Sequence, residues 1–87
     1  MNYKLYDADV LVTQLRDEGV AFNSSTNEYL SLNETSFKIL KGIENSLTTE
    51  DICEKLENEY NVSPNECREA VNNTIRLLLS KKLIIEQ

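Results

Sequence analysis

The chain contains no histidine, and this absence excludes several kinds of catalytic site. Without histidine, the 87 residues cannot form the Ser-His or Cys-His pairs that activate many nucleophiles, and they lack the imidazole ligands of mixed zinc sites. The two glycines, Gly19 and Gly42, lie far apart, so no glycine-rich loop is present to bind a phosphate group. We therefore expect no enzyme, no metal site and no cofactor.

Cysteine and long apolar runs are also scarce. Cys53 and Cys67 are the two thiols, and both occupy apolar positions of predicted helices, which favours buried and reduced side chains. The opening segment, residues 1–5, lacks an extended apolar core. We therefore expect neither a signal peptide nor a membrane span, no membrane partner, and a cytoplasmic location.

Basic residues are outnumbered by acidic ones. Nine Lys and Arg residues stand against fifteen Asp and Glu residues, giving a formal net charge of -6 and a pI of about 4.5. This balance disfavours nucleic acid as a partner, because phosphate contacts need clustered positive charge. With 40% hydrophobic residues, the chain is expected to fold as one small domain over residues 1–87 with a modest core.

Residues 28–35 are the clearest organising feature of the sequence. Apolar and polar residues alternate over 28–32, which predicts a strand with Leu30 and Leu32 on one face. Asn33 ends this alternation, and its side chain is suited to cap a following helix. The strand therefore leads directly into a helix.

Two earlier segments also have the composition of strands. They cover residues 10–15 and 20–23, and with the strand above they predict a three-stranded antiparallel meander. Residues 16–19 are expected to form the first turn, with Gly19 free to adopt a positive φ. Residues 1–8 show no clear period and are expected to be loosely ordered.

Three helices are predicted after the meander. They cover residues 34–44, a segment that begins after Thr48, and a long segment from Pro64 to about Lys82, followed by a short apolar tail that packs on the core. Asn45 is expected to end the first helix in the left-handed conformation. The expected caps are Asn33, Thr48 with an acidic first turn, and Ser63 in a capping box with Pro64 and Glu66.

The last predicted helix carries a wide apolar stripe. Ile75 and Leu79 extend the stripe to one side, either as further core residues or as a second apolar surface that lines a groove. If the strand at 28–32 lies at a sheet edge beside this helix, its backbone groups are open to an extended peptide. The expected core stripe comprises Cys67, Ala70, Val71, Thr74, Leu77 and Leu78.

Three short motifs follow one another in a recognisable order: Tyr29–Thr35, Thr48–Ile52 and Leu83–Ile84. With the order of strands and helices, they resemble the PqqD-like proteins, which are RiPP recognition elements that bind leader peptides of ribosomally made precursors. The resemblance spans about residues 10–85. It implies an α+β fold of the winged helix-turn-helix-like type, with an N-terminal three-stranded antiparallel sheet followed by three helices.

The sequence departs from the family pattern at three positions. Asn45 and Lys82 stand where the family commonly has glycine, and Leu40 replaces an aromatic residue that is common in the first helix. Asn45 is compatible with the backbone conformation that glycine would adopt. Lys82 leaves the conformation of the Leu83–Ile85 tail open.

The resemblance implies where a leader peptide binds. The peptide would add a strand to residues 28–32, with its apolar side chains directed toward the third helix. Leu30 and Leu32 either line this cleft or serve only the core, and Arg76 either pairs with an acidic leader residue or is a solvated cation. The implied peptide-binding residues are Glu28, Tyr29, Leu30, Ser31, Leu32, Asn72, Ile75, Arg76 and Leu79.

The implied function is delivery of a precursor peptide rather than catalysis. The domain would hold the leader peptide and contact a maturation enzyme, which raises the local concentration of the core peptide at the active site. That enzyme is either the leader peptidase of lasso peptide assembly or a radical SAM maturase. The open strand at 28–32 also allows a homodimer through this strand.

Two other functions are compatible with a small helical domain. A winged-helix DNA-binding regulator would present its last helix to DNA, yet residues 63–87 carry four basic and three acidic residues in a chain of net charge -6. Such a distribution argues against a DNA reader. An acyl-carrier role would need a Ser within an Asp-Ser-Leu motif, and the sequence has none.

Overall fold

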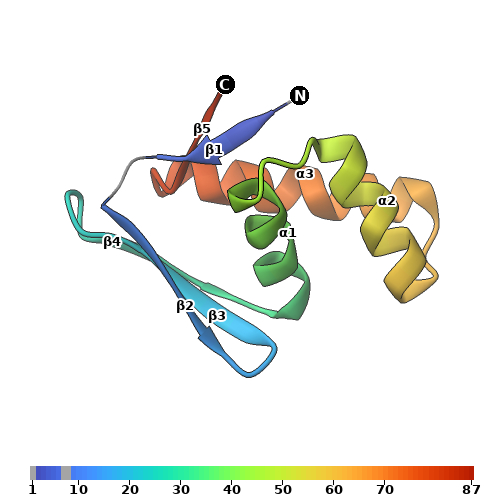
Figure 1. Ribbon diagram of the computed structural model, residues 1–87, viewed down its shortest axis with the longest axis horizontal. Coiled ribbons are helices and arrows are strands. Elements are labelled where there is room, and N and C mark those ends of the chain that lie inside the picture. Colours follow the sequence, from blue (N-terminus) through green and yellow to red (C-terminus); the bar gives the residue numbers. More distant parts are fainter. Residues whose placement is uncertain (1, 7–8) are drawn as a thin grey trace.

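The computed structural model describes residues 2–6 and 9–87 (Figure 1). The α+β architecture is as predicted, and a short strand that was not predicted follows the last helix. The described residues form, in chain order, β1 (Tyr3–Leu5), β2 (Val10–Leu15), β3 (Glu18–Asn23), β4 (Glu28–Leu32), α1 (Glu34–Glu44), α2 (Thr49–Tyr60), α3 (Pro64–Ser80) and β5 (Ile84–Glu86).

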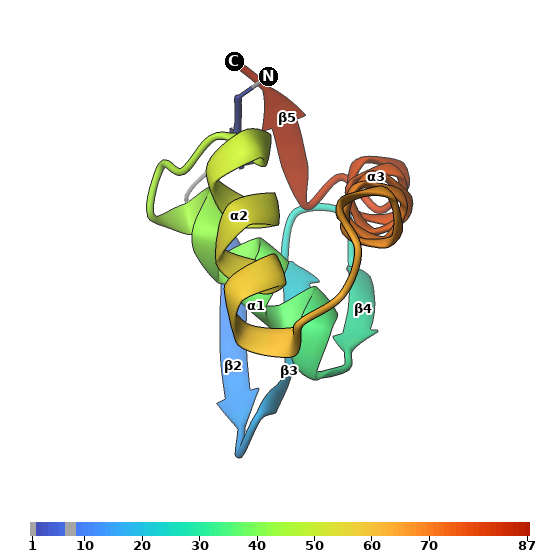
Figure 2. The same ribbon diagram turned by 90° about the vertical axis from the view of Figure 1, so that its right-hand side faces the viewer.

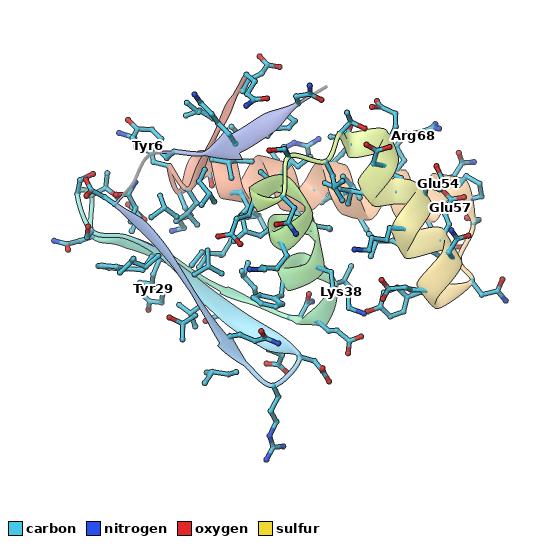
Figure 3. All side chains as sticks on the ribbon, in the orientation of Figure 1. Tyr6, Tyr29, Lys38, Glu54, Glu57 and Arg68 are labelled. Carbon is cyan, nitrogen blue, oxygen red and sulfur yellow. The ribbon has the colours of Figure 1, made fainter. Side chains whose placement is uncertain are left out.

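The predicted meander is confirmed as a three-stranded antiparallel sheet in the order β2-β3-β4. The helices cover one face of this sheet (Figures 1 and 2). Ala21 pairs with Leu30 on the covered face, whereas Phe22 pairs with Tyr29 on the opposite face. Figure 3 shows Tyr29 on the side of the sheet away from the helices, where its side chain is 63% exposed.

The first turn differs from the prediction. It consists of Arg16 and Asp17, β3 already begins at Glu18, and the positive φ of 59° belongs to Arg16 rather than to Gly19. Glycine is needed at position 19 for a different reason. A Cβ atom there would lie 2.5 Å from Cδ1 of Phe37, so the ring of this α1 residue packs directly on the strand backbone.

A second, two-stranded sheet was not predicted. β1 pairs antiparallel with β5, with Lys4 opposite Ile85. The expectation of a loosely ordered segment is therefore wrong for residues 3–5, while residues 1, 7 and 8 lie outside the described residues. The C-terminal tail packs on the core as predicted, because Leu83 and Ile84 are both buried.

One core joins the sheet to the helices. Within α3 the expected stripe is buried at four positions, but Leu77 is 53% exposed and Ala70 is half-buried, so the helix is rotated toward Ile75. The buried core residues are Val10, Ala21, Leu32, Phe37, Ile39, Leu40, Ile43, Ile52, Leu56, Cys67, Val71, Ile75, Leu78, Leu83 and Ile84.

The predicted helix starts are confirmed. The side chain of Asn33 accepts a hydrogen bond from the backbone N–H of Ser36 at 2.9 Å. Thr48 and Asp51 form a complete capping box. Ser63 caps α3 by accepting from the N–H of Glu66, but within the described chain the expected second bond, from the Ser63 N–H to the Glu66 carboxylate, is not formed.

Helices α1 and α3 end in the same backbone motif. In α1 the left-handed residue is Ser46, one position after the predicted Asn45. In α3 it is Lys82, with φ 56°, and the N–H groups of Lys82 and Leu83 donate to the carbonyls of Leu79 and Leu78. This is a Schellman motif, in which Lys82 adopts the conformation that glycine usually supplies.

Replacing Lys82 by glycine is therefore expected to stabilise the protein. A left-handed conformation costs an L-residue about 1–2 kcal/mol, and the greater freedom of glycine in the unfolded chain offsets roughly half of this. We expect Lys82→Gly to raise the free energy of unfolding by about 0.5–1 kcal/mol in chemical denaturation. Lys81→Gly is the control: Lys81 has φ -94° and pairs with Glu28, so this variant should lose stability. A loss of stability in Lys82→Gly would contradict the account.

Candidate functional site

Strand β4 is one of the two edge strands of the larger sheet, β2 being the other. It pairs with β3 on one side, and on its other side no described strand follows. In an antiparallel ladder, alternate residues direct their N–H and C=O groups toward a neighbouring strand. The free side of β4 therefore presents a row of backbone donors and acceptors that can pair with an extended peptide.

A buried asparagine links the sheet to the end of α3. Asn23, fully buried at the end of β3, donates a hydrogen bond from Nδ2 to the carbonyl oxygen of Lys82 at 2.7 Å. Its Oδ1 accepts from both the backbone N–H and the hydroxyl of Ser25. Every polar atom of this buried side chain has a protein partner, so the side chain fixes the β3–β4 turn against the α3–β5 junction.

The first residue of β4 is joined to the same junction. Lys81 Nζ lies 3.4 Å from Oε2 of Glu28. The edge strand and α3 are thus tied together at one end by Asn23 and Glu28. Figure 1 shows β4 leading away from this end toward the start of α1, while α3 runs in a different direction.

We expect Asn23→Ala to destabilise the protein by roughly 1–3 kcal/mol, because the Lys82 carbonyl and the β3–β4 turn lose their partner. Urea denaturation measures the effect. Ser25→Ala is the control, since it removes one hydroxyl from an exposed residue and leaves the Asn23–Lys82 bond in place. Equal stability of Asn23→Ala and the wild-type protein would show that this bond does not hold the two parts together.

The predicted strand residues fall into two groups. Leu32 is buried and Leu30 is half-buried on the core face, so their side chains belong chiefly to the core. Tyr29 and Ser31 are exposed on the other face, and Glu28 is half-buried beside Lys81. The backbone of these residues, rather than one set of side chains, forms the open edge.

The predicted helix residues share one side of α3. Asn72, Arg76 and Leu79 are spaced four and three residues apart, and all three are exposed. Ile75 is only 5% exposed and belongs to the core, whereas Leu79 is 39% exposed. The two interpretations of the wide stripe therefore each hold for one residue. Ile75 is a core residue, whereas the side chain of Leu79 is an accessible apolar surface.

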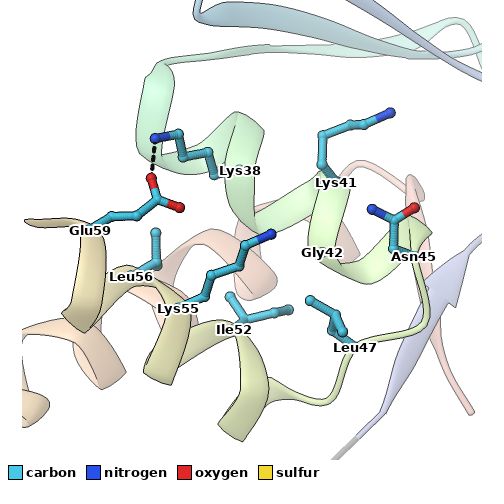
Figure 4. Close-up of a pocket in the computed structure, with 9 residues that line it drawn as sticks. All are labelled: Lys38, Lys41, Gly42, Asn45, Leu47, Ile52, Lys55, Leu56 and Glu59. Carbon is cyan, nitrogen blue, oxygen red and sulfur yellow. Dashed lines mark hydrogen bonds and ion pairs between the residues drawn. The ribbon is translucent and has the colours of Figure 1, made fainter.

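The sequence did not indicate a hollow between α1 and α2 (Figure 4). We call it the α1–α2 hollow; its volume is about 160 Å³. Its sequence signal is weak: two lysines three residues apart on α1, Lys38 and Lys41, and one lysine on α2, Lys55. It is lined by Lys38, Lys41, Gly42, Asn45, Leu47, Ile52, Lys55, Leu56 and Glu59.

A polar cluster joins α1 to α2 beside this hollow. The hydroxyl of Tyr60 donates to Glu34, and this bond is the main reason that the pKa of the Glu34 carboxyl lies below its ordinary value. Lys38 pairs with Glu59, lies 3.6 Å from Glu34 and sits 4.8 Å above the Tyr60 ring. The pKa of Lys38 is raised above its ordinary value, chiefly because of its hydrogen bond to Glu59.

Tyr60→Phe is expected to raise the pKa of Glu34, because it removes the donor that most favours the carboxylate. A carboxyl with a lowered pKa stabilises the fold above its unfolded pKa and loses this effect as the pH falls through its folded pKa. The variant should therefore lose stability at pH 7 and little at pH 3. Carboxyl-carbon NMR titration of Glu34 measures the shift, with Tyr6→Phe as control; an unchanged Glu34 pKa would refute the assignment.

Neither cysteine is in a disulfide. Cys67 is buried and Cys53 is half-buried, so the prediction of buried thiols is confirmed for Cys67 and in part for Cys53. Burial is the main factor that raises the pKa of both thiols. Across residues 2–6 and 9–87, no cluster of three or more Cys, Asp and Glu side chains is arranged to hold a metal ion. In the same residues no helix has both the length and the apolar surface needed to cross a membrane.

The meander, its open edge strand and the three helices define a small α+β domain of the winged helix-turn-helix-like type. Residues 18–84 match the family described as coenzyme PQQ synthesis protein D (PqqD). This segment makes up most of the chain, and the chain belongs to that family. No curated protein sequence matches it.

Two solved structures share the whole fold. One is described as TbiB1 in complex with the TbiA(beta) leader peptide; it has a TM-score of 0.85, 23% sequence identity, and 93% of each chain is covered. The other is a lasso peptide synthetase B1 complexed with the leader peptide, with a TM-score of 0.85, 19% identity, and coverage of 98% of this chain and 99% of that chain. At these sequence identities, the likeness shows only that this chain shares the fold of the two structures.

Proposed function

We propose that the protein binds the leader peptide of a ribosomally synthesised precursor as an added strand on β4. The observation that carries this proposal is the open edge of β4, tied at one end to the residues that end α3. Strand addition uses main-chain hydrogen bonds for affinity and alternate side chains for specificity. Membership of the PqqD family supports the proposal, and so do the leader peptides in the two similar structures.

The side chains of a bound leader peptide would contact the protein on both sides of the added strand. Alternate leader side chains would face Leu30 and the exposed α3 residues Arg76 and Leu79 on one side of the added strand. Those between them would lie beside Tyr29 on the outer face of the sheet. Within the described part of the chain Arg76 has one hydrogen-bond partner, the side chain of Asn73 at 3.4 Å, and so remains available to an acidic leader residue.

The protein is then a non-catalytic carrier. It holds the leader while a maturation enzyme, either a leader peptidase or a radical SAM maturase, acts on the attached core peptide. Holding both partners together converts a bimolecular encounter into an intramolecular one and raises the effective concentration of the substrate. Such a role requires the leader site and an enzyme-contacting surface on one small domain.

We expect Leu79→Glu to weaken leader binding about tenfold or more, because burying a leucine side chain is worth roughly 1.5–3 kcal/mol and about 1.4 kcal/mol is a tenfold change. The matched control is Leu77→Glu. Leu77 is also an exposed leucine of α3, but two residues away it faces about 200° around the helix. Fluorescence anisotropy with a labelled leader peptide of a candidate precursor measures both variants.

Equal loss of affinity in the two variants would show that α3 contributes only through charge. Absence of leader binding to the wild-type protein, with salt-sensitive binding to duplex DNA, would replace the proposal by a winged-helix DNA-binding function. The helix itself gives little support to that alternative, since residues 64–80 contain two Arg and two Glu residues.

A homodimer through β4 would use the same backbone groups. Two copies pairing edge to edge would exclude the leader peptide, so dimerisation and leader binding are competitive in this account. Saturating leader would convert any such dimer to monomeric complex, which sedimentation analysis can detect.

A further inference from the structure

The outer face of the three-stranded sheet, on the side away from the helices, carries an apolar row that no described element covers (Figure 1). Leu11 of β2 lies opposite Phe22 of β3, and Phe22 lies opposite Tyr29 of β4. Leu11 is 59% exposed and Tyr29 is 63% exposed, while Phe22 between them is half-buried. The solvent face of an antiparallel sheet is usually polar. This outer row of Leu11, Phe22 and Tyr29 is therefore an apolar surface that lacks a neighbour.

One hydrogen bond shows which backbone groups of the sheet point toward its edges. The N–H of Ser24 donates to the carbonyl oxygen of Asp9 at 3.1 Å. Ser24 and Asp9 lie directly opposite each other, one step beyond the last pair of the β2–β3 ladder. Hydrogen-bonded pairs alternate along an antiparallel ladder, so the next such pair is Leu11 with Phe22. These two residues direct their N–H and C=O groups toward each other.

The same alternation determines the open side of β4. Because the backbone groups of Phe22 face β2, the pair that Phe22 forms with Tyr29 is not hydrogen-bonded. The N–H and C=O groups of Tyr29 therefore face the open edge. Ser31, two residues further along, faces the same way, whereas the backbone groups of Leu30 face β3. A strand added to β4 thus forms its hydrogen bonds with Tyr29 and Ser31.

The outer row ends at both edges of the sheet, but its two ends differ. At the β2 edge, the backbone groups of Leu11 already face β3, so an added strand finds no hydrogen-bond partner in that residue. At the β4 edge, Tyr29 directs its side chain to the outer face and its backbone groups to an added strand. A peptide strand on β4 therefore bonds to the residue at which the apolar row ends, and β4 is the edge at which the row can be extended.

We infer that the sheet recognises an aromatic or β-branched apolar residue of the leader peptide, which lies opposite Tyr29 on the outer face and extends the outer row to a fourth strand. This inference rests on the proposed function, because strand addition on β4 supplies the fourth position. Neighbouring strands lie about 4.8 Å apart, and aromatic side chains pair favourably with aromatic or β-branched ones across adjacent strands. Ser31 offers only a hydroxyl group to the position opposite it, so no comparable preference is expected there.

The charges of the outer face favour an apolar residue at this position over a charged one. Among the outer-face residues of β2, β3 and β4, Glu18 alone is charged, and it lies opposite Leu15 beside the first turn. A charged leader residue opposite Tyr29 would have no partner of opposite sign next to it on this face. An apolar residue would instead cover part of the exposed Tyr29 ring, which is favourable.

The first test selects binders from a displayed library of random 12-residue peptides, using the wild-type protein, Tyr29→Thr and Leu15→Thr. Threonine keeps the tendency to form a strand, and Leu15 is a matched control because it is also 63% exposed on the outer face. Among peptides that shift the amide signals of Tyr29 and Ser31, we expect one position to be enriched in aromatic and β-branched apolar residues. Tyr29→Thr should lose this enrichment and Leu15→Thr should keep it; the same enrichment with all three proteins would overturn the inference.

A double-mutant cycle then measures the contact itself. In one selected peptide, the residue with NOEs to the Tyr29 ring is replaced by threonine, and both peptides are titrated into the wild-type protein and Tyr29→Thr. Each substitution alone should weaken binding roughly two- to fivefold, as expected for one cross-strand pair. The two together should weaken it by less than the product of the two losses, because they remove the same contact. Losses that multiply in full would overturn the inference.

The amide signals of β4 distinguish failure of this inference from failure of the proposed function. Peptides that bind along β4 without any preference that depends on Tyr29 would overturn the extension of the outer row and leave strand addition in place. If no selected peptide shifts the amide signals of Tyr29 and Ser31, strand addition on β4 itself fails, and the inference fails with it.

Discussion

The arrangement of the site depends on the hydrogen bonds made by the buried carboxamide of Asn23. It is fully buried, and its hydrogen bonds reach the turn after β3 and the carbonyl of Lys82 at the end of α3. Segments almost sixty residues apart in the chain are thereby joined at one point. The left-handed conformation of Lys82 is part of the same junction, because it ends α3 and directs the chain into β5.

This junction explains how a small domain can keep a strand edge open and still hold it in place. The start of β4 is fixed to the end of α3 by Asn23 and by the Glu28–Lys81 ion pair, and the end of β4 leads into α1 through the Asn33 cap. Both ends of the edge strand are therefore anchored before any peptide arrives. Preorganisation of this kind lowers the entropic cost of binding, since only the peptide has to become ordered.

Local signals in the sequence predicted much of the fold. The cap residues Asn33, Thr48 and Ser63 were correctly identified because capping depends on a few neighbouring residues. β1 was missed because three residues make a strand only by pairing with β5, about eighty positions away. The requirement for glycine at position 19 was also missed, because it arises from contact with the Phe37 ring and not from the turn.

The candidate site was predictable in outline but not in detail. The family resemblance indicated the β4 edge and α3, and the structure leaves Asn72, Arg76 and Leu79 exposed together on that helix. Helical spacing alone could not show that Ile75 is buried while Leu77 faces solvent, because the rotation of α3 is set by its packing. The α1–α2 hollow forms only where two helices meet, so no single segment of the sequence predicts it. The peptide-binding residues themselves remain a prediction.

The most direct measurement is a set of intermolecular NOEs in a complex of the ¹³C,¹⁵N-labelled protein with unlabelled leader peptide. The account predicts cross-strand contacts from leader Hα and amide protons to the backbone of Tyr29, Leu30 and Ser31, with side-chain contacts to Leu79. Contacts confined to the outer face of the sheet or to the α1–α2 hollow, with none along the β4 backbone, would contradict strand addition.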